Sequence, residues 1–465
     1  MSSTDTSMAR ERILSLLDAN SFVEVGAMVT KRSTDFNLLE KEVPADGVIT
    51  GYGLIDNKPV YVYSQDSSSL NGTIGEMHAK KIAGIYSLAL KVGAPVVGLI
   101  DCAGIRLQEA TDALAGFGDL YLKQTLASGV IPQITAVFGN CGGGVAVSSA
   151  LSDFTIMEEK NAKLFVNSPN AIENNYIAKC DTSSAKFQAE AGVVDVVGAD
   201  EQEVLEKVRE LVSVLPSNNE DETFIETNDD LNRIVSGSLD PLEMLKEVSD
   251  QNQFVEIKKA YATDMVVGFI KLNGMTVGAV ANKEDSLSTD GCKKAASFVN
   301  FCDAFNIPVV TFTNVAGYKA TKEEEKTIAS AAASLTYAFA NATVPKVNVI
   351  TGKAYGSTYI TMNSKHIGAD LVFAYPDAKI GMMDANNAAQ IMYAEELEAA
   401  ADKKAFLSEK AKEYETVQSS PVSAAKRGYV DSIIEPQSTR KQLVYAFEML
   451  FTKRENRPSK KHGTM

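Results

Sequence analysis

The chain repeats itself at an offset of 213 residues, as from position 80 to position 293, and this duplication constrains its fold most strongly. No gap interrupts the match between positions 80 and 143. Matched prolines and glycines repeat backbone geometry as well as hydrophobicity. The sequence therefore predicts two homologous halves. The matched pairs are Lys80-Lys81 with Lys293-Lys294, Pro95-Val96-Val97 with Pro308-Val309-Val310, Ala103-Gly104 with Ala316-Gly317, Pro132 with Pro345, Gly139 with Gly352, and Gly143 with Gly356.

Outside this stretch the offset drifts, as insertions would cause. "GYGLI" at 51–55 resembles "GFIKL" at 268–272, and "FVEV" at 22–25 resembles "FVEI" at 254–257. The polar and acidic stretch "LPSNNEDETFIETNDD" at 215–230 is typical of a linker. We therefore predict two domains, over residues 1–228 and 229–465.

Each half is predicted to alternate strands and helices, which is typical of an α/β fold with helices covering a sheet. Loops at the carboxyl ends of parallel strands bind ligands in such folds. In the first half, the sequence predicts strands over 47–55, 58–66, 94–104 and 132–140, helices over 76–93 and about 107–128, and a further helix that begins at the glycine cluster.

The stretch "FGNCGGGVAVSSA" at 138–150 contains three consecutive glycines but neither of the familiar glycine-rich phosphate-binding patterns. Each half carries two small-residue loops after strands: Ala103-Gly104 with Gly142–Gly144, and Ala316-Gly317 with Gly356–Thr358. Two convergent loops with uncovered N–H groups can bind an oxygen that carries negative charge, as an oxyanion hole does. Close helix–strand packing also demands glycine and remains the alternative.

Composition excludes several other classes of function. The net charge of −15 argues against a broad nucleic-acid interface. The five cysteines form no C-x-x-C pair, and the three histidines are scattered, so we expect neither a disulfide framework nor a metal site. The N-terminus lacks the apolar core of a signal peptide, and no apolar run approaches a membrane span. We expect a cytoplasmic protein. Cys102 and Cys141 flank the loops, but no histidine lies near them in sequence.

Six further segments are long and specific: "VYSQDSSSLNGTIGEMHAKKI", "GAPVVGLIDCAGIRLQEATDALAGFGDLYLKQTLASGVIPQI", "SDFTIMEEKNAKLFV", "FCDAFNIPVVTF", "ATVPKVNVITGKAYGSTY" and "AAKRGYVDSIIEPQSTRKQL". They resemble the carboxyltransferase subunits of biotin-dependent acyl-CoA carboxylases and decarboxylases, and the resemblance covers nearly the whole chain. This is the family of the propionyl-CoA carboxylase β subunit and the methylmalonyl-CoA decarboxylase α subunit.

The resemblance implies two tandem crotonase-like domains (ClpP/crotonase superfamily), with residues 1–228 on the CoA side and 229–465 on the biotin side. It implies a carboxylate transfer between carboxybiotin on a separate carrier and the α-carbon of a short acyl-CoA, from acetyl- or propionyl-CoA to malonyl- or methylmalonyl-CoA. The implied partners are a biotin carboxyl carrier protein, a biotin carboxylase and further copies of the chain, as a homohexamer. The same transfer in reverse, in a sodium-pumping decarboxylase with membrane subunits, is the alternative.

The resemblance also implies site residues. The amides of Gly143 and Gly144 form one oxyanion hole, and those of Ser357 and Thr358, after Gly356, form the other. Ile360 lies near the acyl group, although a core isoleucine is an equal possibility. The adjoining substrate contacts are Ala103, Gly104, Arg106, Ala316, Gly317 and Tyr318. Arg106 and three lysines are candidates for the CoA phosphates, against the alternative of paired or solvated surface residues; the lysines are Lys80, Lys81 and Lys353.

The sequence departs from the family pattern at four places: "DCAGIR" at 101–106, "GST" at 356–358, the acidic "NVAGYKATKEEE" at 314–325, and "TIASAAASL" at 327–335. Two further hypotheses stay open, and the changes at 314–325 motivate the second of them. One is a single-substrate crotonase-type hydratase or isomerase, for which Glu109 is the available acid. The other is a paralogue that keeps the fold but has lost turnover.

Overall fold

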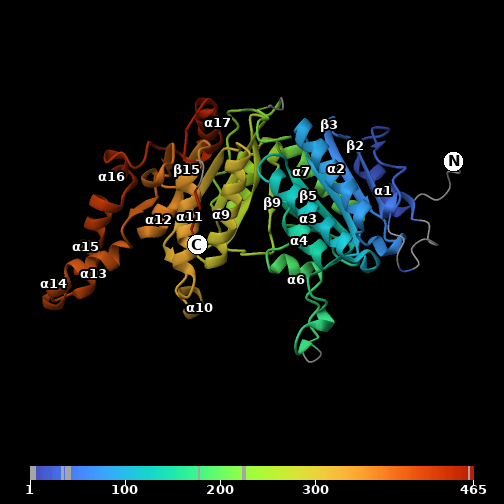
Figure 1. The fold of residues 1–465 in the computed structure, drawn as a ribbon. Coiled ribbons are helices and arrows are strands. Elements are labelled where there is room, and N and C mark those ends of the chain that lie inside the picture. Colours follow the sequence, from blue (N-terminus) through green and yellow to red (C-terminus); the bar gives the residue numbers. More distant parts are fainter. Residues whose placement is uncertain are drawn as a thin grey trace. The chain divides into compact units, whose positions relative to one another are not determined.

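The structure is a computed structural model that describes residues 7–32, 36, 43–175, 179–222, 227–458 and 461–464 (Figure 1). It divides into two compact units. The first, the N-terminal unit, comprises Met1–Glu222 with Lys258–Tyr261, and the second, the C-terminal unit, comprises Thr223–Ile257 with Ala262–Met465.

The N-terminal unit is built on one sheet, in the order β1-β2-β3-β4-β5-β6-β8, with β7 also paired to β5. The first three strands are antiparallel neighbours and the others pair in parallel. Its strands are β1 (Val23–Glu24), β2 (Val48–Ile55), β3 (Lys58–Gln65), β4 (Val96–Cys102), β5 (Gln133–Gly142), β6 (Phe154–Glu158), β7 (Lys163–Phe165) and β8 (Val196–Gly198). Its helices include α1 (Met8–Leu16), α2 (Glu76–Val92), α3 (Ala110–Ala127), α4 (Gly144–Ala150), α6 (Ala185–Glu190) and α7 (Glu201–Val214).

The C-terminal unit repeats this plan with the order β18-β16-β15-β13-β11-β10-β9, with β17 also paired to β15, and adds a two-stranded sheet of β12 and β14. Its strands are β9 (Val255–Ile257), β10 (Met265–Leu272), β11 (Met275–Asn282), β12 (Ser286–Leu287), β13 (Val309–Val315), β14 (Gly317–Tyr318), β15 (Lys346–Tyr355), β16 (Leu371–Ala374), β17 (Lys379–Gly381) and β18 (Ser432–Ile433). Its helices include α8 (Pro241–Val248), α9 (Thr289–Ala304), α10 (Lys322–Glu325), α11 (Ile328–Asn341), α12 (Gly356–Thr361), α13 (Ala385–Met392), α14 (Ala394–Ala399), α15 (Lys403–Tyr414), α16 (Pro421–Lys426) and α17 (Thr439–Leu450).

The two sheets match in register, which confirms the predicted α/β class and the duplication. Val96 pairs with Gln133 between β4 and β5, and Val309 pairs with Lys346 between β13 and β15. Both pairs shift register just before their loops, where Cys102 faces Cys141 and Val315 faces Ala354. A bulge re-aims the chain at the end of a strand. The duplication therefore places the same irregularity beside the glycine loops of both units.

The predicted elements of the first half agree with the structure, with one difference at the second helix. A single 3-10 turn over Leu107–Glu109 precedes α3, and the break falls at Ala110, whose φ is 44°. β4 is almost wholly buried, as expected of a strand covered on both faces. α2 ends where Gly93 takes the left-handed conformation (φ 72°), which glycine adopts without a side-chain penalty.

The matched lysines of the repeat have a structural role. Lys81 is buried on α2, and its ammonium donates to the carbonyls of Ala45 and Val48 at the start of β2. Lys294 on α9 donates to Ala262 and Met265 at the start of β10. Burial lowers the pKa of Lys81 to about 8.

Part of the predicted linker packs on the N-terminal unit. Asn218 donates through Nδ2 to the carbonyl of Gly93 (2.8 Å), and the amide of Asn219 donates to the carbonyl of Val130 (3.0 Å). Residues 223–226 of that linker lie outside the described residues. Within the described residues, no helix is long and apolar enough to cross a membrane.

Candidate functional site

The three glycines of the N-terminal loop have three different structural roles. A Cβ on Gly142 would lie 3.1 Å from the Phe165 ring, and one on Gly144 would lie 2.9 Å from the Tyr121 hydroxyl. Gly143 combines a φ of 60° with a ψ of −123°, a backbone conformation open to glycine, and a Cβ there would meet nothing within 4 Å. Packing therefore leaves little room for a side chain at Gly142 or Gly144, while Gly143 faces open space.

The amides of this loop differ in what they bind. The Gly143 N–H donates to the carbonyl of Phe165 on β7 (2.8 Å). Gly144 is the first residue of α4, where an N–H has no intrahelical acceptor, and no acceptor for it lies among the described residues. Its carbonyl accepts from the Tyr121 hydroxyl (2.7 Å), which fixes the start of the helix. The donor that remains open at this loop is the Gly144 amide.

The second N-terminal loop meets the first, as predicted. A Cβ on Gly104 would lie 3.4 Å from the Gly142 carbonyl oxygen, and one on Gly142 would lie 3.2 Å from that of Ala103. The Gly104 amide donates to the Cys102 sulfur (3.4 Å), and the Ala103 amide donates to the Asn71 carbonyl (3.1 Å). Ala103 is exposed and Gly104 is buried, so this loop supplies a small surface beside the glycine cluster.

Asp101 supports the strand ends beneath these loops. Its carboxylate accepts from the Ser67 hydroxyl (2.8 Å) and pairs with Arg12 (3.4 Å). A Cβ on Gly139 would lie 2.1 Å from Asp101 Oδ1, which explains a glycine there. At the matched Gly352, a Cβ would lie 2.5 Å from Asn314 Oδ1, so this glycine leaves room for Asn314 in the same way.

The C-terminal loop repeats the positive φ of the N-terminal loop, at the matched glycine. Gly356 has a φ of 58°, and a Cβ there would lie 3.2 Å from the Met382 carbonyl oxygen. Ser357 is exposed in the first turn of α12, where N–H groups lack intrahelical acceptors. Thr358 is buried, and its hydroxyl donates to the Tyr355 carbonyl (2.7 Å). The Ser357 amide therefore occupies the position that the Gly144 amide occupies in the other unit.

The altered segment 314–325 keeps a contact of the repeat despite its acidic sequence. Glu109 accepts from the Glu76 amide at the start of α2 (2.6 Å), and Glu324 accepts from the Thr289 amide at the start of α9 (2.7 Å). A carboxylate at a helix N-terminus accepts a hydrogen bond from a free N–H, and its negative charge interacts favourably with the helix dipole. This segment therefore still anchors the helix beside the C-terminal loop.

Two of the remaining predicted residues of this loop, Gly317 and Tyr318, form β14, and Ala316 directly precedes them. Gly317 and Tyr318 pair in parallel with Ser286 and Leu287 of β12, while the amide of exposed Ala316 donates to the Asp285 carbonyl (2.6 Å). A Cβ on Gly317 would meet nothing within 4 Å, so a ligand can approach the backbone closely there.

Sequence profiles and structures of known proteins agree on the family. The profile described as "Carboxyl transferase domain" matches residues 3–465. This chain belongs to the carboxyl transferase domain family. It is 39% identical over 479 residues to the methylmalonyl-CoA decarboxylase subunit alpha of Propionigenium modestum, covering 98% of this chain and 92% of that protein. It is 41% identical over 474 residues to the putative propionyl-CoA carboxylase beta chain of Bacillus subtilis (strain 168), covering 98% and 93%.

Among solved structures, this carboxyltransferase resembles transcarboxylase 12S in its complex with methylmalonyl-coenzyme A and methylmalonic acid. The TM-score is 0.93 at 38% identity, over 98% of this chain and 91% of that one. Transcarboxylase 12S forms a hexamer assembly. The predicted crotonase-like fold and the predicted enzyme class are thereby confirmed.

The substrate contact predicted for Arg106 in this carboxyltransferase is wrong, because the side chain is fully buried in an ion-pair cluster. It pairs with Asp46 (2.5 Å) and Glu109 (2.7 Å), and donates to the Thr73 carbonyl (2.8 Å). Both carboxylates are also buried. Arg106 and Glu109 are therefore structural residues, which also removes Glu109 as a free acid for a hydratase.

The three candidate lysines are all paired. Lys80 forms an ion pair with Glu76, and Lys353 forms one with Asp285 (2.9 Å); both lysines are exposed. Lys81 caps backbone carbonyls, as described above. Surface pairs of this kind contribute about 0–1 kcal/mol to stability.

Ile360 is 40% exposed on α12, so the alternative of a fully buried core position does not hold. Its repeat partner Val147 is 41% exposed on α4. Each glycine loop is thus followed by one aliphatic side chain on the open face of its helix.

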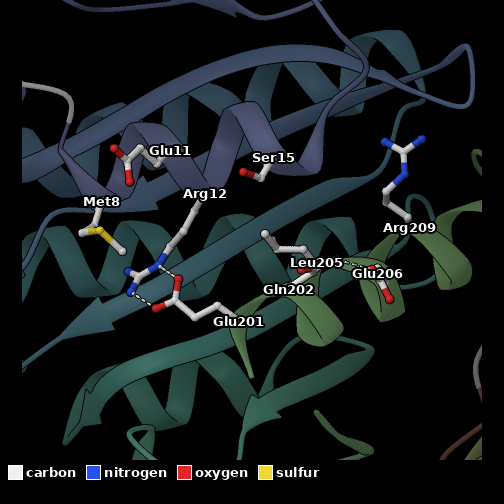
Figure 2. Close-up of a pocket in the computed structure, with 9 residues that line it drawn as sticks. All are labelled: Met8, Glu11, Arg12, Ser15, Glu201, Gln202, Leu205, Glu206 and Arg209. Carbon is white, nitrogen blue, oxygen red and sulfur yellow. Dashed lines mark hydrogen bonds and ion pairs between the residues drawn. The ribbon is translucent and has the colours of Figure 1, made fainter. Parts of the chain in front are cut away.

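A further pocket of about 430 Å³ lies between α1 and α7 in the N-terminal unit, with the Arg12–Glu201 pair inside it (Figure 2). None of the predicted site residues lines it. The described residues contain no group of three or more His, Cys, Asp or Glu placed to hold a metal ion.

Several important residues gave no sequence signal. Asp46 lies sixty residues before Arg106, and it stands in no recognisable motif. Glu324 repeats the role of Glu109 at an offset two residues longer than the main repeat, which hides it in a direct comparison. Burial raises the pKa of Cys102 to about 12, so that thiol beside the loop is not an activated nucleophile.

Proposed function

We propose that the chain transfers a carboxylate between carboxybiotin on a separate carrier and the α-carbon of a short acyl-CoA, such as acetyl- or propionyl-CoA. One observation carries this proposal: each unit presents an open amide at the start of a helix, Gly144 on α4 and Ser357 on α12, beside a glycine with positive φ. Carboxylate transfer develops negative charge on two oxygens, one in each substrate. Each oxygen needs an oxyanion hole, and one of these amides can supply the N–H donor of each hole.

The domain predicted over residues 1–228, which the N-terminal unit largely comprises, is proposed to bind the acyl-CoA. The Gly144 amide would donate to the thioester oxygen as the enolate forms, and Gly143 would leave space for the thioester to approach. The Ala103-Gly104 loop would border the acyl chain. Removing one donor of this kind costs about 3–4 kcal/mol of transition-state stabilisation.

The domain predicted over residues 229–465, which the C-terminal unit largely comprises, is proposed to bind the biotin. Biotin supplies the ureido nitrogen that carries the carboxylate. The Ser357 amide, with that of Thr358, would donate to the ureido oxygen, and the open backbone at Gly317 would admit the ring. The described residues fit such a group, because a Cβ at Gly317 meets nothing within 4 Å.

The assembly is proposed to be a homohexamer that works with a biotin carboxyl carrier protein and a biotin carboxylase. The support is the hexamer assembly of transcarboxylase 12S, which resembles this chain over nearly its full length. The alternative is the reverse transfer in a membrane decarboxylase, which the similarity to methylmalonyl-CoA decarboxylase subunits alpha favours.

The test is decarboxylation of malonyl-CoA or methylmalonyl-CoA by the purified protein, with and without free biotin or biocytin. We expect loss of the carboxylate to depend on biotin, and the faster substrate to identify the acyl preference. No loss with either substrate, from intact protein that binds CoA by calorimetry, would contradict the proposal and favour an inactive paralogue. Turnover without biotin would favour single-substrate chemistry instead.

A further inference from the structure

Three hydroxyl groups form a chain that connects the C-terminal loop to two helices. The Tyr318 phenol on β14 lies 3.1 Å from Thr361 Oγ1 on α12. Thr361 Oγ1 lies 3.1 Å from Thr336 Oγ1 on α11, and Thr336 donates to the Ala332 carbonyl (2.8 Å). Thr361 is buried, so the link between Tyr318 and α12 is shielded from water.

The chain has one direction of donation, because each hydroxyl carries a single proton. Thr336 gives its proton to a carbonyl, so it can only accept from Thr361. Thr361 must then accept from Tyr318. The Tyr318 hydroxyl proton is donated to Thr361. The phenol oxygen keeps lone pairs, and no described residue donates a hydrogen bond to them. The chain thus presents Tyr318 as a hydrogen-bond acceptor.

The acceptor belongs to one unit alone. The bridge between Leu287 and Tyr318 has its repeat counterpart in the bridge between Ile74 and Ile105. Ile105 has no hydroxyl, so the N-terminal loop lacks this acceptor. The two loops, which match in backbone, therefore differ in the ligand chemistry that they can recognise.

We propose that Tyr318 is a specificity-determining residue, whose phenol oxygen accepts a hydrogen bond from an N–H group of the ligand at the C-terminal loop. This rests on the proposed function, in which the ureido ring of biotin supplies that N–H. Thr361 acts as a positioning residue, because it holds the phenol through its hydroxyl. The pantetheine amides of CoA are the other source of N–H groups, and the test separates the two.

The test measures KM for free biotin and for malonyl-CoA or methylmalonyl-CoA in biotin-dependent decarboxylation. We expect Tyr318→Phe to raise KM for biotin about three- to tenfold, the effect of one neutral hydrogen bond, and to leave KM for the acyl-CoA within about twofold. Thr361→Val should raise KM for biotin in the same direction. Thr361→Ser should leave KM for biotin at the wild-type value, because serine keeps the hydroxyl that Thr361→Val removes. Urea unfolding of each variant reports its stability separately.

Desthiobiotin sharpens the assignment, since it keeps both ureido N–H groups but lacks the sulfur ring. Tyr318→Phe should raise KM for biotin and KM for desthiobiotin by the same factor. A loss with biotin alone, a rise in KM for the acyl-CoA instead, or no change in either KM would overturn the inference. Absence of biotin-dependent turnover in the wild-type protein would instead overturn the proposed function on which it rests.

Discussion

Replacing Arg106 by methionine tests whether this residue holds the fold or the substrate. Its guanidinium compensates two carboxylates that are themselves buried, Asp46 and Glu109, with exposed side-chain fractions of 0% and 1%. A Cβ on Gly75 would lie 2.4 Å from the guanidinium, so the cluster is tightly enclosed. The variant would leave two buried carboxylates without their cation.

We expect Arg106→Met to lower the free energy of unfolding by about 3–5 kcal/mol, the typical cost of breaking a buried ion pair by removing one partner. Burial already raises the pKa of Asp46, and Arg106 opposes that rise. Without the guanidinium, the pKa of Asp46 rises further. The deficit should therefore shrink as the pH falls from 7 to 5, because protonation removes the uncompensated charge.

The assay is urea unfolding at a fixed protein concentration, because subunit association adds to apparent stability. Lys319→Met is the matched control: it occupies the repeat position of Arg106 but is exposed, and we expect a change within about 0.5 kcal/mol. A loss below about 1 kcal/mol in Arg106→Met, together with a raised KM for the acyl-CoA, would refute the structural role.

Three further predictions concern stability. Gly139→Ala should lower the free energy of unfolding by about 1–3 kcal/mol, because its Cβ would lie 2.1 Å from Asp101; unchanged urea midpoints would contradict this. Burial lowers the pKa of His78 to about 3, so stability is lost as the pH falls from 6.5 towards 3. Between pH 6.5 and pH 5, the free energy of unfolding of the wild type should fall by about 2 kcal/mol more than that of His78→Gln. Parallel pH profiles of the two proteins would contradict this prediction. Glu324→Ala should cost about 1 kcal/mol through the lost cap on α9, while exposed Glu325→Ala should cost nothing measurable in the same titration.

The repeat is the part of the fold that the sequence predicts best. Prolines and glycines such as Pro95 and Gly139 are constrained by the backbone itself, so their spacing survives where side chains have changed. The strands of the first half were predictable for the same reason, since β4 and β5 are buried runs bounded by such residues. The site could be placed at the strand ends because both glycine loops follow them.

The roles of charged residues could not be read from the sequence. An arginine after a small-residue loop has the same local pattern whether it binds an anion or a buried carboxylate, and only the fold brings Asp46 to Arg106. The acidic segment at 314–325 departs from the family pattern, which favours a loss of activity. In the structure, however, Glu324 of this segment caps a helix as Glu109 does in the other unit. The link from Tyr318 to Thr361 joins residues forty-three positions apart and follows no motif.

The central claim is that a backbone amide on each unit stabilises negative charge, and Ser357 tests it most directly because its amide and side chain can be removed separately. Ser357→Pro deletes the N–H, whereas Ser357→Ala keeps it and deletes the exposed hydroxyl. The measurement is kcat for biotin-dependent decarboxylation of malonyl-CoA or methylmalonyl-CoA, with folding checked by circular dichroism. We predict a loss of about 10²–10³ in Ser357→Pro and a near wild-type rate in Ser357→Ala. Equal rates in both folded variants would contradict the account.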